Sequence, residues 1–291
     1  MPEDTKQGVF AKQSLNNVEF TAIRRLADSC ASYEDLDLRL SWNMLESRAS
    51  DVAEDFLYYT DDLLIGFLTL FGVGSDEAEA TGMVHPEYRR KGVFTALLTA
   101  AGEESRRNGT KSLVFAYDRR SAAAKAFLEA SGAHYAFSEQ KMRLETPVKR
   151  ASLDNHLDFR QATVEDADAI AQIISDDSGM DAAFFRQVVA NGIRNRSRWY
   201  YIAKLDGQTI GTINVDVIDG DSYIYGFVIR PEYRGRGYGR QMLVRTIDTI
   251  VVERPQPVFL EVETNNDVAL ALYHSFGFTI TNTYDYYRIE I

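Results

Sequence analysis

The stretch HPEYRRKG at residues 85–92 returns as RPEYRGRG at residues 230–237, displaced by 145 positions. The same displacement relates Ile65-Gly66 to Ile210-Gly211, Ala124 to Ala269, and Gly132 to Gly277, with no gap in between. A constant register over this length is the signature of an internal repeat, and a repeat decides the fold before any single element does. The sequence therefore predicts a duplicated structural unit.

The length of 291 residues accommodates two domains, because single domains cluster at roughly 100 to 150 residues. The segment around residues 145–152 is polar, contains Pro147 and shows no periodicity, which is typical of a linker. We predict an N-terminal domain at residues 1–146, a linker at 147–156 and a C-terminal domain at 157–291.

The second copy shows the order of elements most clearly, as βααβββαβαββ. The Asp206-Gly207 dipeptide is typical of a tight hairpin between two strands. Apolar residues at helical spacing after Gly239 predict a helix that ends near Val252. The expected strands are 158–162, 198–203, 209–217, 223–229, 258–263 and final strands through Ile280 and Tyr287, and the remaining helices are about 164–175, 182–193 and 266–275.

The bulk composition excludes several classes of protein. The formal net charge is -11 and both halves are acidic, which disfavours nucleic-acid binding. Cys30 is the only cysteine, and the four histidines are scattered, so we expect no disulfide and no metal site. No stretch approaches the ~18 apolar residues of a membrane span, and no signal peptide is visible at the start. We expect a cytoplasmic protein without nucleic-acid or membrane partners, and the sequence leaves a homodimer open.

The stretch Arg234-Gly235-Arg236-Gly237-Tyr238-Gly239 lies where a strand ends and a helix begins. The first N–H groups of a helix lack partners within the helix, so a pyrophosphate can accept several hydrogen bonds there. Glycine lets the backbone approach the phosphates closely. The alternative is a plain glycine-rich turn with solvated arginines. A dinucleotide fingerprint and a P-loop are both excluded, because Arg240 stands where a third glycine is needed and no Gly-Lys-Ser/Thr occurs.

The pattern Arg234-x-x-Gly237-x-Gly239, entered by Val228-Ile229-Arg230-Pro231, resembles the acetyl-coenzyme A signature of the GNAT (Gcn5-related N-acetyltransferase) superfamily. The order of elements is also similar to that fold, a mixed α/β fold with a mostly antiparallel sheet flanked by helices. The resemblance implies two tandem GNAT folds. It also implies that the pantetheine arm of the coenzyme lies where the strand 223–229 splays from the strand 258–263.

A second segment, Glu261 to Tyr273 followed by Gly277-Phe278, is similar to the superfamily enzymes that acetylate the N-terminal alanine of a ribosomal protein. The resemblance implies that Glu261 is the general base and that Tyr273 protonates or holds the leaving sulfur. A backbone N–H near Ile229 would polarise the carbonyl. Glu263, Tyr225 or a water are alternatives for the base, Tyr273 could instead only pack, and Asn266 could be only a helix cap. The coenzyme-binding candidates are Val228, Ile229, Arg234, Gly235, Arg236, Gly237, Tyr238, Gly239, Arg240, Asn266 and Tyr273.

In the first copy, the displacement of 145 places Ala116 at the position of Glu261 and Leu128 at that of Tyr273. This copy keeps a phosphate turn but lacks both proton-transfer groups, although Asp118 or Tyr117 could substitute. We predict a degenerate N-terminal domain with a second coenzyme A site formed by Val84, Arg89, Arg90, Lys91, Gly92, Val93 and Phe94.

The sequence thus favours an N-acetyltransferase that moves an acetyl group from acetyl-coenzyme A to a primary amine of a small molecule or a peptide N-terminus, with the C-terminal domain active. The alternative is a non-catalytic tandem module that senses acyl-coenzyme A. A carboxylate and a phenol together favour the enzyme, because a sensor needs neither.

Overall fold

The computed structural model describes residues 5–48, 50–145, 157–179, 181–218, 220–253 and 256–291. The chain forms two compact units. Unit 1 comprises the chain up to Glu139 together with Asn282–Ile291, and unit 2 comprises Gln140–Thr281.

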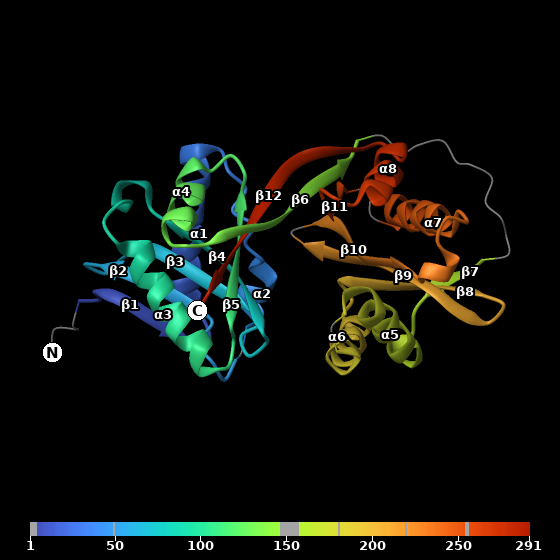
Figure 1. Cartoon of the computed structure of the whole chain (residues 1–291), viewed down its shortest axis with the longest axis horizontal. Coiled ribbons are helices and arrows are strands. Elements are labelled where there is room, and N and C mark those ends of the chain that lie inside the picture. Colours follow the sequence, from blue (N-terminus) through green and yellow to red (C-terminus); the bar gives the residue numbers. More distant parts are fainter. Residues whose placement is uncertain (1–4, 49, 146–156, 180, 219, 254–255) are drawn as a thin grey trace. The chain divides into compact units, whose positions relative to one another are not determined.

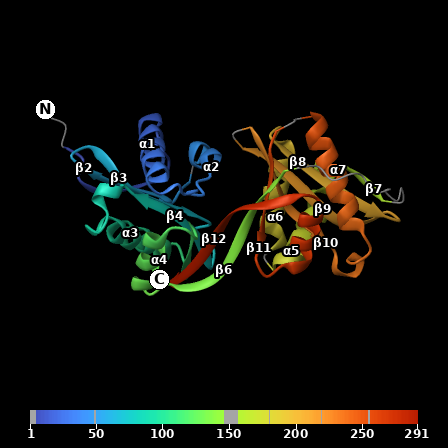
Figure 2. The same ribbon diagram turned by 90° about the horizontal axis from the view of Figure 1, so that it is seen from above.

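Unit 1 is a sheet of strand order β1-β2-β3-β4-β5-β12-β6 with helices on both faces (Figure 2). Its elements are β1 (Gly8–Lys12), α1 (Asn17–Glu34), α2 (Trp42–Ser47), β2 (Asp55–Thr60), β3 (Leu63–Phe71), β4 (Glu77–Val84), η1 (Pro86–Tyr88), α3 (Val93–Arg107), β5 (Ser112–Asp118), α4 (Ala122–Ala130), the first part of β6 (His134–Leu144) and the last part of β12 (Phe278–Glu290).

Two hydrophobic clusters cover the two faces of the unit 1 sheet. Ile23 of α1 and Leu45 of α2 pack on one face with Phe67. Leu97 of α3 and Leu128 of α4 pack on the other face.

The helix α1 begins with a capping box, in which the Asn16 side chain accepts hydrogen bonds from the Val18 and Glu19 backbone N–H groups, and this arrangement fixes its first turn.

Unit 2 has the same layered arrangement, with α7 and α8 on one face of its sheet and α5 and α6 on the other (Figure 1). Its strand order is β12-β6-β11-β10-β9-β8-β7, in which β6 contributes its last part and β12 its first part. Its elements are β7 (Asp158–Gln161), η2 (Val164–Asp166), α5 (Ala167–Ser178), α6 (Ala182–Arg194), β8 (Arg198–Leu205), β9 (Gln208–Ile218), β10 (Asp221–Ile229), η3 (Pro231–Tyr233), α7 (Tyr238–Glu253), β11 (Val258–Glu263) and α8 (Asp267–Ser275).

The predicted fold class is confirmed: each unit is a mixed α/β sandwich with a mostly antiparallel sheet, and β10 pairs with β11 in parallel as β4 does with β5. The three-strand meander β8-β9-β10 is also confirmed. The Asp206-Gly207 dipeptide forms the predicted hairpin, and both residues take the positive φ that such a turn requires, 49° and 81°. The expected final strands through Ile280 and Tyr287 are one strand, β12.

The last strand of the chain changes units along its length. Phe278–Thr281 belong to unit 2, whereas residues 282–290 belong to unit 1, where Tyr284 to Glu290 pair antiparallel with β5. In the same way β6 starts in unit 1 and ends in unit 2. The bounds of the compact units thus differ from those of the predicted domains, 1–146 and 157–291. The predicted domains describe the two sequence repeats and stay a prediction. The predicted linker 147–156 lies outside the described residues.

None of the helices that the structure describes is long and apolar enough to span a membrane.

Candidate active site and coenzyme-binding turns

The turn between β10 and α7 has the geometry of an anion site. Gly235 and Gly237 take φ angles of +74° and +81°, in the left-handed region that glycine adopts at no steric cost. Successive backbone N–H groups in such turns form a concave nest for anions. The 16-residue helix α7 begins directly after the turn, at Tyr238, and adds the unpaired N–H groups of its first turn.

Unit 1 keeps the same turn at a higher conformational cost. Arg90 occupies the position of Gly235 and has a φ of +63°, and Gly92 has a φ of +80°. A non-glycine residue in the left-handed region costs roughly 1 to 2 kcal/mol. Such strain is usually retained where the backbone conformation serves a site. The N-terminal turn therefore keeps the geometry of a phosphate site although its sequence has lost one glycine.

The first arginine of each turn connects the end of the strand before the turn to the first α-helix of its unit, α5 in unit 2 and α1 in unit 1. The Arg234 Nε donates to the Ile229 carbonyl at 2.8 Å, and its Nη2 pairs with Asp177 of α5 at 2.7 Å. In unit 1 the Arg89 Nε donates to the Val84 carbonyl at 3.2 Å, and its Nη1 pairs with Glu34 of α1 at 2.8 Å. Both guanidinium groups are thus already paired with a carboxylate.

Two further arginines of the C-terminal turn have other contacts. The exposed Arg236 guanidinium lies over the Tyr233 ring at 5.7 Å. The Arg240 Nη1 donates to the Ser275 Oγ of α8 at 3.0 Å, and its guanidinium lies over the Phe276 ring. Arg236, which stands between the two glycines of the nest, therefore adds an exposed positive charge there, whereas Arg240 connects α7 to α8.

The strands β10 and β11 part where the sequence predicts a splay. The parallel pairing is limited to three residues of each strand, Ser222–Ile224 of β10 and Val258–Leu260 of β11. Beyond Ile224, β10 bulges between Tyr225 and Val228, and Gly226 in the bulge has a φ of +53°. A Cβ on Gly226 would lie 2.5 Å from the Nδ2 of the buried Asn214, so any other residue would have to displace that side chain. The bulge frees the backbone of β10 from β11, and Val228 and Ile229 lie on its freed half.

Glu261 lies on the freed half of β11 and is partly exposed. Phe259, two residues earlier, stacks on Tyr223 of β10 at 5.2 Å. Because side chains two apart share a face, Glu261 and the exposed Glu263 lie on that same face, which α5 and α6 cover. Both carboxylates that the sequence offers as a base are therefore on one side of the sheet.

Tyr273 lies on the opposite face. It is 7% exposed on α8 and packs in the cluster that contains Val262 and Phe278. Burial raises the pKa of Tyr273 to about 12. A phenol with this pKa stays protonated at neutral pH and can donate a proton or a hydrogen bond, but it does not accept a proton.

Two groups near the splay are not found by sequence reasoning. Asn214 is fully buried, its Oδ1 accepts from the Thr212 hydroxyl at 3.1 Å, and its Nδ2 has no hydrogen-bond partner among the described residues. The Lys141 ammonium lies 5.3 Å from the centre of the Phe259 ring. No local signal in the sequence identifies either residue. The environment of Asn214 is set by the bulge on the neighbouring strand, and Lys141 precedes the second repeat.

Tyr225, an alternative base by its place in the sequence, has a buried hydroxyl without a geometric hydrogen-bond partner in the described chain. Burial raises its pKa well above the ordinary value, so this phenol is not a base.

Asn266 is the N-cap of α8. Its Oδ1 accepts from the Ala269 N–H at 3.1 Å, and the Oγ of Ser121, its equivalent in unit 1, accepts from the Ala124 N–H at 3.3 Å. The cap role is therefore observed in both copies, and a coenzyme contact of Asn266 stays a prediction.

Unit 1 contains a cavity of about 770 Å³ at the corresponding splay. Residues Glu77–Ala80 of β4 pair in parallel with Ser112–Phe115 of β5. The cavity lies beyond this paired part of the two strands. We call it the N-terminal cleft. Ala116 and Leu128, the equivalents of Glu261 and Tyr273, both line it. The positions that the resemblance assigns to catalysis therefore line a cavity in the copy that has alanine and leucine there.

The two copies exchange one aromatic ring for glycine. In unit 1 the Phe94 ring of α3 fills the space above Gly82, where a Cβ would lie 2.7 Å from the ring. In unit 2 the equivalents are Gly239 and Phe227, and a Cβ on Gly239 would lie 3.5 Å from the Phe227 ring. The space between helix and strand is therefore filled by Phe94 of α3 in unit 1 and by Phe227 of β10 in unit 2. A phenylalanine at the position of Gly239 thus fits the fold because the facing strand residue is a glycine.

Comparisons with known proteins agree with this arrangement. The model of the acetyltransferase (GNAT) family matches residues 20–133 and 163–278. The N-alpha-acetyltransferase RimI of Mycobacterium tuberculosis (strain ATCC 25618 / H37Rv) is 32% identical over 122 residues, which cover 40% of this chain and 72% of that protein. The mycothiol acetyltransferase of Clavibacter sepedonicus is 27% identical over 238 residues, 75% of each chain.

Two solved structures share the fold along nearly the whole chain. A GCN5-related N-acetyltransferase from Sphaerobacter thermophilus has a TM-score of 0.79 at 17% identity and covers 97% of this chain and 95% of its own. A tandem GNAT protein from the clavulanic acid biosynthesis pathway has a TM-score of 0.75 at 17% identity and covers 97% and 98%. With two family segments that together span most of its length, the chain is a tandem member of the GNAT acetyltransferase family, an N-acetyltransferase that uses an acyl-coenzyme A donor.

Proposed function

We propose that unit 2 transfers an acetyl group from acetyl-coenzyme A to a primary amine of a small molecule or a peptide N-terminus. The observation that carries this proposal is the contrast between the two copies. At Glu261 and Tyr273 unit 2 has a carboxylate and a protonated phenol on the two sides of its splayed strand, and at these two positions unit 1 has Ala116 and Leu128.

The residues of unit 2 fit the coenzyme. The nest at Gly235 and Gly237 offers backbone N–H groups to a pyrophosphate, and Arg236 adds an exposed positive charge. The first turn of α7, at residues 238–240, completes this site with its unpaired N–H groups. The freed backbone at Val228 and Ile229 offers hydrogen-bonding groups to amides along the splay. Acetyl-coenzyme A, when bound, supplies the thioester from which the acetyl group leaves.

Glu261 accepts the proton that the ammonium form of the acceptor must lose before its nitrogen can attack. A base placed within hydrogen-bond reach contributes about 10² to 10⁴ in rate. Tyr273 donates its proton to the sulfur as the carbon–sulfur bond breaks and regains a proton from solvent. The base and the acid are separate residues on opposite faces of the sheet, so the amine would approach from the α5 and α6 face and the coenzyme from the α7 and α8 face.

The acceptor is an amine, and two relatives support the two classes proposed. One relative is called an N-alpha-acetyltransferase and the other a mycothiol acetyltransferase. The acidic character of this chain, with a net charge of -11, favours acceptors that arrive as cations.

The test is release of free thiol from acetyl-coenzyme A by the full chain, measured across peptides with free N-termini, polyamines and amino sugars. We expect at least one class to give amine-dependent release that falls by about 10² or more in the Glu261→Gln variant. Thiol release that is the same in Glu261→Gln and in the wild type with every active amine would refute the assignment of the base.

We also propose that the N-terminal turn is a second coenzyme A site, formed by Val84, Arg89, Arg90, Lys91, Gly92, Val93 and Phe94. The left-handed Arg90 and Gly92, the exposed Lys91 and the start of the 15-residue helix α3 support it.

A further inference from the structure

The backbone of Ile229, at the end of β10, faces the splay. Ile229 pairs with Gly211 of β9. The next residue, Arg230, donates its N–H to the Ile210 carbonyl of β9 at 2.9 Å. In an antiparallel pair, successive residues direct their backbone polar groups alternately toward the partner strand and away from it. The N–H and the carbonyl of Ile229 therefore point away from β9, to the side where β11 has parted from β10.

The carbonyl of Ile229 is already engaged on that side. It accepts a hydrogen bond from the Arg234 Nε at 2.8 Å, and the Nη2 of the same guanidinium pairs with Asp177 of α5 at 2.7 Å. The peptide group between Ile229 and Arg230 is thus held at both ends, at its oxygen by Arg234 and at its nitrogen by β9. This arrangement engages the carbonyl of Ile229 and leaves its N–H directed at the splay.

Unit 1 has the same arrangement, built from a different position on the helix. Arg89 joins the Val84 carbonyl at the end of β4 to the carboxylate of Glu34. Glu34 is the last residue of α1, whereas Asp177 is the last but one of α5. The two carboxylates thus stand at different places on their helices, yet each reaches the first arginine of its turn. The contact recurs although the position does not, which indicates that the contact itself is what is required.

Asp177 stands where its charge does not help the helix. It lies in the last turn of α5, which has no basic residue, and the partial negative charge at a helix C-terminus disfavours a carboxylate. The pair with Arg234 adds little stability, because the two side chains are 45% and 52% exposed and exposed ion pairs contribute little. The stability of unit 2 therefore does not account for Asp177, whereas its hold on Arg234 does.

Resting on the transfer proposed for unit 2, we propose that Asp177 is a positioning residue that acts through Arg234 on the backbone of Ile229. Asp177 holds the guanidinium, and the guanidinium holds the carbonyl of Ile229. The N–H of Ile229 is thereby kept where it donates to the thioester oxygen as negative charge develops there. The resemblance places Arg234 among the coenzyme-binding residues. In this proposal it serves the coenzyme through the backbone, and the phosphates are left to the glycine nest and Arg236.

The test measures kcat and the KM for acetyl-coenzyme A by thiol release from the full chain. Asp177→Asn keeps the size of the side chain and removes its charge. We expect its kcat to fall by about three- to tenfold, because a small displacement of a group at the reacting centre costs rate. The KM should change by less than about twofold, and the thermal midpoint by less than about 2 °C.

Two changes of Arg234 separate a positioning role from a phosphate contact. Arg234→Met removes every donor and should lower kcat by about 10- to 100-fold. Arg234→Lys keeps the positive charge but lacks the Nε donor, so it should not restore kcat. A phosphate ligand would behave differently, because lysine also binds phosphate as a point charge. The KM would then rise in Arg234→Met and return toward wild type in Arg234→Lys.

Asp176, one residue earlier on α5, provides the matched control. It pairs with Arg230 at 3.2 Å, and the Arg230 Nε donates to the Thr209 carbonyl and not to Ile229. Asp176→Asn removes the same charge from the same helix end and should leave kcat within about twofold of wild type. Exchange of the Arg230 amide, followed by NMR without any substrate, should be faster in Asp177→Asn and unchanged in Asp176→Asn.

Three results would each overturn the inference. They are a wild-type kcat in Asp177→Asn, equal falls in Asp176→Asn and Asp177→Asn, and a raised KM in Arg234→Met that Arg234→Lys restores. The proposed function is tested separately by the wild type. Turnover in the wild type with a wild-type kcat in Asp177→Asn refutes only this inference. Faster exchange of the Arg230 amide in Asp177→Asn, in a chain without amine-dependent turnover, refutes the proposed function and upholds the action of Asp177 on the strand.

Discussion

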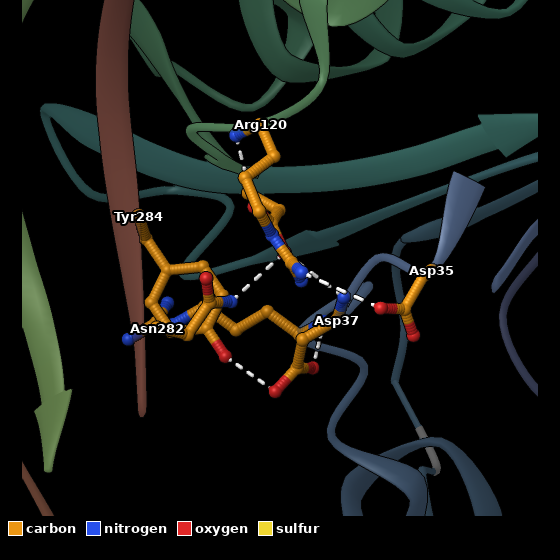
Figure 3. Close-up of polar contacts among 7 residues, drawn as sticks. Asp35, Asp37, Arg120, Asn282 and Tyr284 are labelled. Carbon is orange, nitrogen blue, oxygen red and sulfur yellow. Dashed lines mark hydrogen bonds and ion pairs between the residues drawn. The ribbon is translucent and has the colours of Figure 1, made fainter. Parts of the chain in front are cut away.

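The last strand should stabilise different units at its two ends. Phe278 is 1% exposed in the main cluster of unit 2, and Tyr284 is 1% exposed in a cluster of unit 1. Truncation of a buried aromatic side chain to alanine costs about 3 to 5 kcal/mol. Tyr284→Ala also removes the hydroxyl that donates to Asp37 (Figure 3). We therefore expect each variant to destabilise one unit by an amount comparable with much of a domain's total stability.

Hydrogen exchange followed by mass spectrometry measures this effect by segment. Tyr284→Ala should accelerate amide exchange in β5, its pairing partner, by roughly 10² to 10³ and leave β9 nearly unchanged. Phe278→Ala, on the same strand but within unit 2, is the matched control and should do the reverse. If both variants accelerate exchange in unit 2 and neither does in unit 1, the strand belongs to the second repeat alone and does not cross between the units.

Three further predictions concern single residues of unit 2. Asp166 accepts two hydrogen bonds from Arg160, at 2.7 and 2.9 Å, and these bonds lower its pKa; Asp166→Asn should therefore cost about 2 to 3 kcal/mol at pH 7. Since a lowered folded pKa gives stability that is present above the unfolded value of about 3.9 and lost below it, the difference in urea midpoint should shrink below about pH 4, and a constant difference would contradict the role of the charge. Gly226→Ala should cost about 1 to 3 kcal/mol more than Gly207→Ala in thermal denaturation, because both residues have positive φ but only Gly226 has a neighbour within 2.5 Å of the added Cβ, and equal costs would contradict the packing at the bulge. Because the pKa of Tyr273 is about 12, its ionisation should cause no loss of turnover rate up to about pH 10. A fall of the rate near pH 9 that disappears in Tyr273→Phe would contradict the raised pKa of this phenol.

Much of the fold follows from local pattern. The hairpin at Asp206-Gly207, the meander and the helix after the glycine-rich turn are set by residues close in sequence, and the structure confirms them. The alternating tail around Tyr284 predicts a strand equally well. Its partner strand does not follow, because the same alternation would suit any neighbouring strand with a buried face. Pairing of this tail with β5 is a property of the whole chain topology.

The candidate site divides in the same way. Glu261, Tyr273 and the glycines of the turn are recognisable from residue type and spacing. The pairing of Arg234 with Asp177 is not, since the aspartate lies 57 positions upstream and on another element. The contact of the buried Asn214 with Gly226 and the hydrogen bond from the Asn282 Nδ2 to the Asp118 carboxylate likewise join distant segments. Long-range hydrogen bonds leave no pattern in one sequence.

The central claim is that Glu261, with Tyr273, carries the transfer in unit 2. The most direct measurement compares thiol release by the full chain in three variants, Glu261→Gln, Glu263→Gln and the double variant Glu261→Gln with Tyr273→Phe. We expect a fall of about 10² or more for Glu261→Gln, a rate close to wild type for the exposed Glu263→Gln, and no less a fall for the double variant. Turnover at the wild-type rate in the double variant would contradict the claim and place the reaction elsewhere in the chain.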